Sequence, residues 1–168
     1  MKARKGFTLV ELLIVIVIIG ILAAAMLLSS SSATASAEAS NIVSELRNLK
    51  AASMMFYSDS MDTVNAGEAN SIINGSGSAK SLLGKYMDNP EKLSALYLFK
   101  TTEITGVGRK WVVGYNLAQV TAEVREKLAG KAKSTGLYSG GGSDQSPTSI
   151  AAANIFTVSG VSVWMIAR

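Results

Sequence analysis

The chain has 168 residues, enough for one domain built around a single hydrophobic core. Its net charge is +4, but three of the basic residues stand within the first five positions, so the rest is almost neutral and lacks a basic block for nucleic acid. The absence of Cys and His excludes disulfide scaffolds, Cys or His zinc sites, and catalysis by a thiol or an imidazole.

The first predicted element is an apolar segment over residues 7–28, interrupted only by Thr8, Glu11 and Gly20. As a helix it would be about 33 Å long, enough to cross the hydrocarbon core of a bilayer. The basic residues before it place the N-terminus on the cytoplasmic side by the positive-inside rule. We therefore expect everything after residue 28 to be exported.

A secretory signal peptide is the simplest alternative, with cleavage after Ala35 or Ala37, where small residues alternate. Two features oppose it. The apolar segment is longer than the usual signal peptide, and it contains Glu11. An unpaired ionised carboxylate in a membrane helix costs free energy, so we expect Glu11 to have an interaction partner.

The sequence from Arg4 to Val15, RKGFTLVELLIV, resembles the class III signal of bacterial type IV pilins and type II secretion pseudopilins. The resemblance implies that a membrane prepilin peptidase cuts after Gly6 and then methylates the new amine of Phe7. It also implies that Glu11, with Thr8, acts in filament assembly. The implied fold is α+β, with a long N-terminal helix packed on a small antiparallel sheet.

On this basis residues 1–6 are a leader and residues 7–57 a long helix, whose part 7–28 spans the membrane and later enters the filament core. Residues 58–168 form a head with an αβ loop, hairpins and a Gly/Ser-rich loop. Cleavage at Gly6 would create an amine four residues before Glu11. In a staggered bundle, Glu11 of one subunit can neutralise the Phe7 amine of a neighbour, which fixes the register.

The helix is expected to continue beyond the membrane. Residues 29–40 are small and polar and suit either a linker or a helix, but an apolar stripe with helical spacing follows: Ile42, Leu46, Leu49, Ser53 and Phe56. The family usually has Pro where this chain has Leu28, which leaves a kink there open. Gly20 and the serines Ser29–Ser32 are the other positions that could loosen the helix.

In the head, residues 58–80 suit a surface loop, 79–87 a short helix, and Asn89–Glu91 a second helix start. Residues 96–104 and 110–117 suit an antiparallel hairpin that turns at Gly106–Gly108. A helix is predicted over 120–128, with Gly130 as its stop, and a flexible loop from Tyr138 to Pro147. Residues 154–158 and 161–166 suit a second hairpin around Ser159-Gly160, which would give a sheet with one apolar face.

No nucleotide-binding motif is complete, no acid/base constellation is evident, and no cofactor or metal is expected, so we do not predict an enzyme. Loop carboxylates could hold calcium, but their loose spacing favours solvated loop acids: Asp59, Asp62 and Glu68 in one loop, Asp88 and Glu91 in another, and Asp144 alone in a C-terminal loop. The aromatic residues with strand spacing most simply fill the core: Phe99, Trp111, Tyr115 and Trp164. An electron-transport chain or a platform for single-stranded DNA is their alternative role.

The sequence therefore predicts a filament subunit that starts as a single-pass precursor in the bacterial inner membrane. Its expected partners are copies of itself, the prepilin peptidase and methylase, the inner-membrane assembly platform and the membrane, with no nucleic acid. A surface pilus and a periplasmic pseudopilus share the same leader, so both stay open. An alternative of another class is a membrane-anchored module that binds a ligand or glycan, in which Gly6 stays uncut and Glu11 is dispensable.

Overall fold

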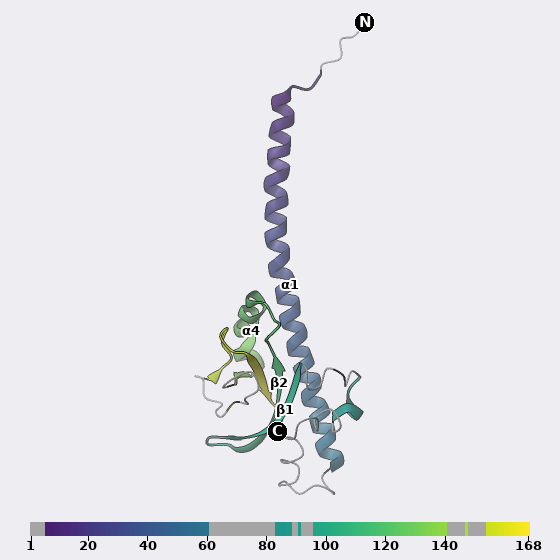
Figure 1. Ribbon diagram of the computed structural model, residues 1–168, viewed down its shortest axis with the longest axis vertical. Helices are drawn as coiled ribbons and strands as arrows, with labels where there is room; N and C mark the ends of the chain where they lie inside the picture. The colour runs from purple at the N-terminus through teal and green to yellow at the C-terminus, as the bar shows by residue number, and fades with distance from the viewer. Residues whose placement is uncertain (1–5, 61–82, 89–90, 92–95, 141–146, 148–153) are drawn as a thin grey trace.

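The computed structural model describes residues 6–60, 83–88, 91, 96–140, 147 and 154–168. One long helix, α1 (Leu9–Ser60), dominates the molecule (Figure 1). Its N-terminal half extends beyond the rest of the chain, and its C-terminal half lies along a head whose described residues form four strands, a second α-helix and a short 3-10 helix. This is the α+β arrangement predicted from the sequence, a long apolar helix packed on a small antiparallel sheet.

Helix α1 begins two residues later and ends three residues later than predicted, and it is continuous. It runs without a break through Gly20 and through Ser29–Ser32, the positions that could have loosened it. Beyond the serines, the Thr34 hydroxyl donates to the Ser30 carbonyl at 3.0 Å. Such a bond satisfies the polar side chain on the helix itself, so these small polar residues do not interrupt the helical backbone.

The sheet is antiparallel throughout and has the strand order β1-β2-β4-β3. Its strands are β1 (Tyr97–Ile104), β2 (Gly108–Asn116), β3 (Leu137–Ser139) and β4 (Ser162–Ile166). The predicted β1–β2 hairpin is confirmed, with Tyr97 opposite Tyr115 and Ile104 opposite Gly108. Gly106 and Gly108 have φ values of 81° and 84°, which glycine adopts without strain.

The main core lies between α1 and the sheet face that carries Phe99 and Val113. All five residues of the predicted helical stripe are buried, from 0% exposed for Leu46 to 8% for Phe56. Ring contacts join helix and sheet where Phe56 stacks on Trp111 at 5.9 Å between centroids, and Phe99 meets Trp111 edge-on at 5.7 Å. The stripe therefore fixes the C-terminal half of α1 to the head.

The opposite face of the sheet is also buried, so the prediction of a single apolar face is wrong. Ile104, Val112 and Trp164 form a second cluster there, and the indole of Trp164 is fully buried. A Cβ on Gly114 would lie 2.6 Å from the Trp164 ring, so glycine makes room for it. The Thr102 hydroxyl donates to the carbonyl of Pro147 at 3.3 Å, which places part of the segment after β3 against this face.

The helix predicted over residues 120–128 is longer than expected. Helix α4 spans Ala122–Thr135 and passes through Gly130, which had the sequence features of a stop. Glycine inside a helix costs about 1 kcal/mol, but Leu128 and Ala132 on either side of it are fully buried, and that packing offsets the cost. The helix ends instead at Gly136, whose φ of 68° forms a left-handed cap.

The second predicted hairpin is also wrong. β4 pairs with β2 and β3, whereas residues 154–158 form no strand and make only a single bridge between Ile155 and Tyr138. The Phe156 N–H donates to the Leu137 carbonyl at 3.0 Å, which holds this segment beside β3. β3 itself lies where the loop from Tyr138 was expected to start.

The region before β1 is described in part. Residues 84–86 form the 3-10 helix η1 (Gly84–Tyr86), within the predicted helix 79–87. Residues 61–82 and 89–90 lie outside the described residues, and with them most of the predicted loop 58–80 and the helix start at Asn89.

Candidate functional site at the N-terminal end of α1

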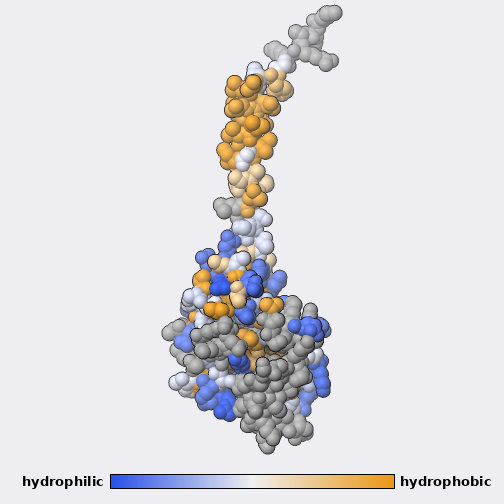
Figure 2. All heavy atoms as spheres, viewed as in Figure 1, coloured by the Kyte–Doolittle hydropathy of each residue, from blue (hydrophilic) through white to orange (hydrophobic). Residues whose placement is uncertain are grey.

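The N-terminal half of α1 carries apolar side chains on all sides, and we call its residues 9–27 the apolar column. Phe7 and the large apolar residues of the column are 50% to 92% exposed. Figure 2 shows them as an orange column that stands apart from the mixed surface of the head. By length and composition α1 can cross a membrane, and its most apolar 18-residue stretch is not buried by any described part of the chain.

The helix begins with a reciprocal hydrogen-bonded cap formed by Thr8 and Glu11. The Thr8 N–H and hydroxyl both donate to Oε2 of Glu11, at 2.7 and 2.8 Å. In return, the Glu11 N–H donates to the Thr8 hydroxyl oxygen at 3.2 Å. This pattern is a capping box, which satisfies backbone donors that lack helical partners at the helix start.

The capping box explains why α1 begins at Leu9 and gives Glu11 a partner within its own chain. The sequence prediction misses this role, although the Thr-x-x-Glu spacing ahead of an apolar run is its known signal. Both bonds from Thr8 run to one oxygen, Oε2. The other carboxylate oxygen, Oε1, can therefore accept an ammonium group without breaking the cap.

The predicted processing site lies immediately before this cap. Gly6 and Phe7 are exposed and precede the helix, and Phe7 is the most exposed of the large apolar residues, at 92%. In the described part of the chain, a Cβ on Gly6 would meet nothing within 4 Å. The bond between these residues is open to an enzyme, as an extended substrate segment needs to be. The structure thus brings all four predicted residues together: Gly6, Phe7, Thr8 and Glu11.

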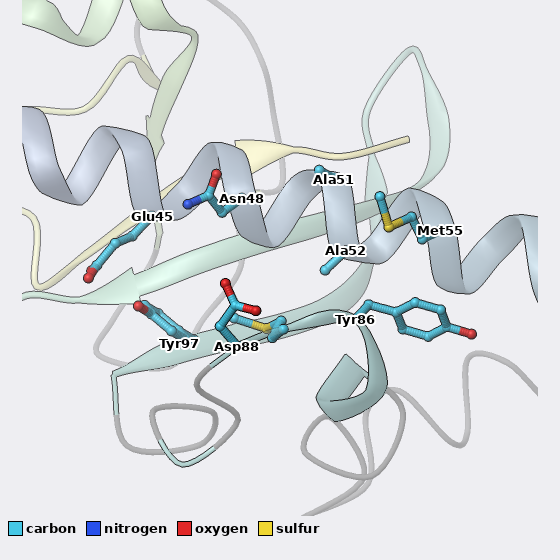
Figure 3. Close-up of a pocket in the computed structure, with 9 residues that line it drawn as sticks. Glu45, Asn48, Ala51, Ala52, Met55, Tyr86, Asp88 and Tyr97 are labelled. Carbon is cyan, nitrogen blue, oxygen red and sulfur yellow. The ribbon is translucent and has the colours of Figure 1, made fainter.

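A groove lies between α1 and the segment at η1 (Figure 3). It has a volume of about 390 Å³, and its polar lining includes Glu45, Asn48 and Asp88. Within the described ranges, no three carboxylates gather as a metal site would require. Of the predicted calcium candidates, Asp59 accepts the Tyr86 hydroxyl at 2.7 Å, whereas Asp62, Glu68 and Asp144 lie outside the described residues.

The aromatic residues singled out in the sequence serve packing. Phe99 and Trp164 are buried, and Trp111 lies between Phe56 and Tyr57 of α1. Tyr115 pairs with Tyr97 across the first two strands, with ring centroids 5.8 Å apart. The contacts of Trp111 therefore join α1 to the sheet, whereas the Tyr97–Tyr115 pair lies within the sheet and Trp164 packs on its other face.

Comparison with known proteins gives one match. Residues 1–27 match the family model described as the prokaryotic N-terminal methylation motif, which covers the leader, the capping box and the apolar column. No curated protein and no solved structure matches the chain significantly. The exposed Gly6–Phe7 junction and the capped apolar column both lie within this motif. Residues 1–27 therefore carry the class III prepilin signal of type IV pilins and pseudopilins, on a chain with a pilin-like fold.

Proposed function

We propose that the chain is a structural subunit of a type IV pilus-like extracellular filament. The observation that carries this proposal is the apolar column, whose side chains are exposed in the described chain and which lies within the methylation motif. A helix that is apolar all round requires a membrane or a bundle of other helices. A filament subunit uses both in turn, first as a membrane precursor and then in the filament core.

Processing prepares the column for this transfer. Hydrolysis of the peptide bond between Gly6 and Phe7 removes residues 1–6, and methylation of the new Phe7 amine follows. Removal of the leader takes three basic residues away from the cytoplasmic side. It leaves a single cationic amine at the helix start, so less charge opposes extraction of residues 7–28 from the bilayer.

Glu11 then sets the register between subunits. In a separate subunit its Oε2 is held by Thr8. In the bundle, we propose, the carboxylate also receives the Phe7 amine of a neighbouring subunit, because a cation buried among apolar helices needs a counter-ion. A subunit out of register would leave both charges unpaired, which is strongly unfavourable in an apolar core.

The experiment is expression of the full chain in a bacterium that has a prepilin peptidase and an inner-membrane assembly platform, followed by electron microscopy and immunoblotting. Wild type should form surface filaments, and Gly6→Leu should accumulate as an uncut membrane precursor. Gly20→Leu is the matched control for processing, because a side chain at Gly20 meets nothing within 4 Å in the described chain. Normal cleavage of Gly6→Leu would contradict the proposal. Filaments confined to the periplasm would assign the chain to a pseudopilus instead.

A further inference from the structure

The C-terminal half of α1 separates its charged residues by sign. From residue 35 to residue 60 it has five charged side chains. With Leu46 as the centre of the buried face and about 100° per residue, the three carboxylates lie about 80° to 140° to one side. The two basic residues lie about 40° to 100° to the other side. The carboxylates are Glu38, Glu45 and Asp59, and the basic residues are Arg47 and Lys50.

The segment at η1 lies on the acidic side and carries one exposed carboxylate, Asp88, and one exposed basic residue, Lys85. The Tyr86 hydroxyl donates to the Asp59 carboxylate at 2.7 Å, which holds η1 against this side of α1. Asp88, two residues further on, is exposed and faces the groove together with Glu45 (Figure 3). We call this surface the acidic flank, made of Glu38, Glu45, Asp59 and Asp88.

Helix α4 adds to the basic side. The Lys131 ammonium donates to the Ser40 hydroxyl at 2.5 Å and to the Ser36 carbonyl at 3.4 Å. Both serines lie about 80° to 120° around α1 from Leu46, on the side of Arg47. Lys127 stands one turn before Lys131 on the same edge of α4 and is exposed, and Glu123 stands one further turn before it at the start of the helix. The basic flank is therefore Arg47, Lys50, Lys127 and Lys131.

The two flanks lie on opposite sides of the molecule and overlap along α1 at Glu45 and Arg47, while α4 lies nearer the N-terminal end of α1 than η1 does. Glu45 and Arg47 are only two residues apart along α1. Figure 1 shows α4 on one side of α1 and the short teal helix η1 on the other. When like-oriented copies stand side by side, opposite sides meet, which is the head-to-tail contact that generates helical fibres.

We propose that the acidic flank of one copy docks against the basic flank of the next copy. This inference rests on the proposed filament function, because a bundle of apolar columns is what holds the copies parallel. Charge complementarity points to a second copy as the partner, since one chain carries both matching surfaces. A two-fold contact would instead bring like charges together, which is unfavourable.

The groove provides a place for a basic side chain of the neighbour. Ala52 and Met55 give it an apolar wall beside the carboxylates of Glu45 and Asp88. A Lys or Arg side chain buries its aliphatic stem on such a wall while its charged head reaches the carboxylates. The flanks thus select both the sign and the length of the side chain that enters.

Charge reversal in the full chain tests the contact. Glu45→Lys alone and Arg47→Glu alone should each lower filament yield by at least about tenfold, because like charges then meet between copies. The double variant should restore most of that yield. The matched controls are Glu103→Lys and Arg109→Glu. These two residues form an exposed ion pair near the tip of the β1–β2 hairpin, with 3.6 Å between Nε of Arg109 and Oε2 of Glu103. The hairpin tip lies away from both flanks (Figure 1). Controls that fail equally, or a double variant that is not rescued, would overturn the inference.

Cross-linking gives a second, independent measurement, because the chain has no cysteine of its own. Asp88→Cys is combined in turn with Arg47→Cys and with Lys127→Cys, and intact filaments are treated with a short bismaleimide. We expect a ladder of dimers, trimers and larger species from at least one double variant, and none from the single variants. Dimers from a single variant would show a two-fold contact and overturn the inference.

These outcomes separate the two proposals. Filaments without any ladder would overturn the flank contact and leave the filament function standing. A wild-type chain that is processed but forms no filament would overturn both.

Discussion

The two halves of α1 share one unbroken backbone but have different surroundings. In the C-terminal half a single stripe of side chains is buried, and Leu46 and Leu49 are fully enclosed by the head. In the N-terminal half the side chains are apolar on every side, and even Leu13 and Val15 are about half exposed. The helix thus continues beyond the contacts with the head, whereas burial within the described chain is confined to its C-terminal half.

The polar residues of the two halves differ in the same way. Ser53, in the C-terminal half, is buried and donates to the carbonyl of Lys50 at 2.7 Å, so it is satisfied within its own helix. Glu11 is the only ionisable residue of the apolar column, and its cap with Thr8 leaves its negative charge uncompensated. The polar group that the monomer does not neutralise is thus the one that the proposed assembly uses.

Truncation should reveal the largest difference between the two halves. A chain that starts at Ala37 keeps the stripe from Ile42 to Phe56 and should unfold cooperatively as a soluble monomer. A chain that starts at Ser58 lacks the stripe, exposes the sheet face that α1 covers, and should show no cooperative transition. Circular dichroism during heating measures both. Equal midpoints would mean that the stripe does not stabilise the head.

The charge of Glu11 should matter to assembly and not to membrane insertion. Glu11→Gln keeps a capping box, because Gln caps as Glu does, but it removes the counter-ion for the Phe7 amine. A stranded buried charge costs about 3 to 5 kcal/mol, so filaments should be lost while the membrane level holds or rises.

Glu11→Val removes both the cap and the charge, and Glu103→Gln is the control on an exposed head carboxylate. Filament yield by electron microscopy is compared with subunit level by immunoblot. Normal filaments from Glu11→Gln but none from Glu11→Val would assign Glu11 to helix capping and remove the register argument.

Shortening one apolar side chain should lower the stability of the head when the residue lies in the C-terminal half of α1, but not when it lies in the N-terminal half. Leu46→Ala should lower the free energy of unfolding of the head by about 2 to 5 kcal/mol, because it leaves a cavity in the packed stripe. Leu13→Ala, at a half-exposed position of the apolar column, should change it by less than about 0.5 kcal/mol. Both Trp residues, Trp111 and Trp164, lie in the head, so urea unfolding of the full chain in detergent is followed by their fluorescence. Similar decreases in the free energy of unfolding for both variants would contradict the claim that only the C-terminal half of α1 packs on the head.

The smallest expected effect is a pH dependence in the C-terminal half. The hydrogen bond to the Asp59 carboxylate raises the pKa of the Tyr86 hydroxyl above its ordinary value. Folding therefore favours the protonated phenol, and this stabilisation is present below about pH 10 and lost as the pH rises through the folded-state pKa. Wild type should be slightly more heat-stable than Tyr86→Phe at neutral pH, and the gap in melting temperature should close above the folded-state pKa. A difference in melting temperature that stays constant with pH would contradict a stabilising hydrogen bond between Tyr86 and Asp59.

Most of this fold could be predicted because its signals are local. Helical spacing alone identifies the stripe through Leu46 and Phe56, and two glycines between β-rich runs identify the β1–β2 hairpin. The end of α4 could not be found in this way. Gly130 and Gly136 look alike in sequence, and only the burial of Ala132 on α1 shows that the helix continues past the first.

The strand pairing near the C-terminus could not be predicted for a different reason. Residues 154–158 and β4 both have strand composition around a Ser-Gly turn, so a local hairpin was the natural expectation. The actual partners, Tyr138 for Ile155 and Trp164 for Gly114, are distant in sequence, and nothing in the composition selects them. At the N-terminus, spacing predicts the grouping of Gly6, Phe7, Thr8 and Glu11, and the Thr-x-x-Glu spacing is also the signal of the reciprocal cap, which the sequence prediction did not use.

The most direct test of the central claim, that the apolar column is matured for assembly, is mass spectrometry of the N-terminus of the full chain after expression with a prepilin peptidase. The account predicts a chain that begins at Phe7 with one methyl group on its amine. A chain that begins at Met1, or one cut after Ala35 or Ala37, would contradict it, because the column would then be a simple anchor or a discarded signal peptide.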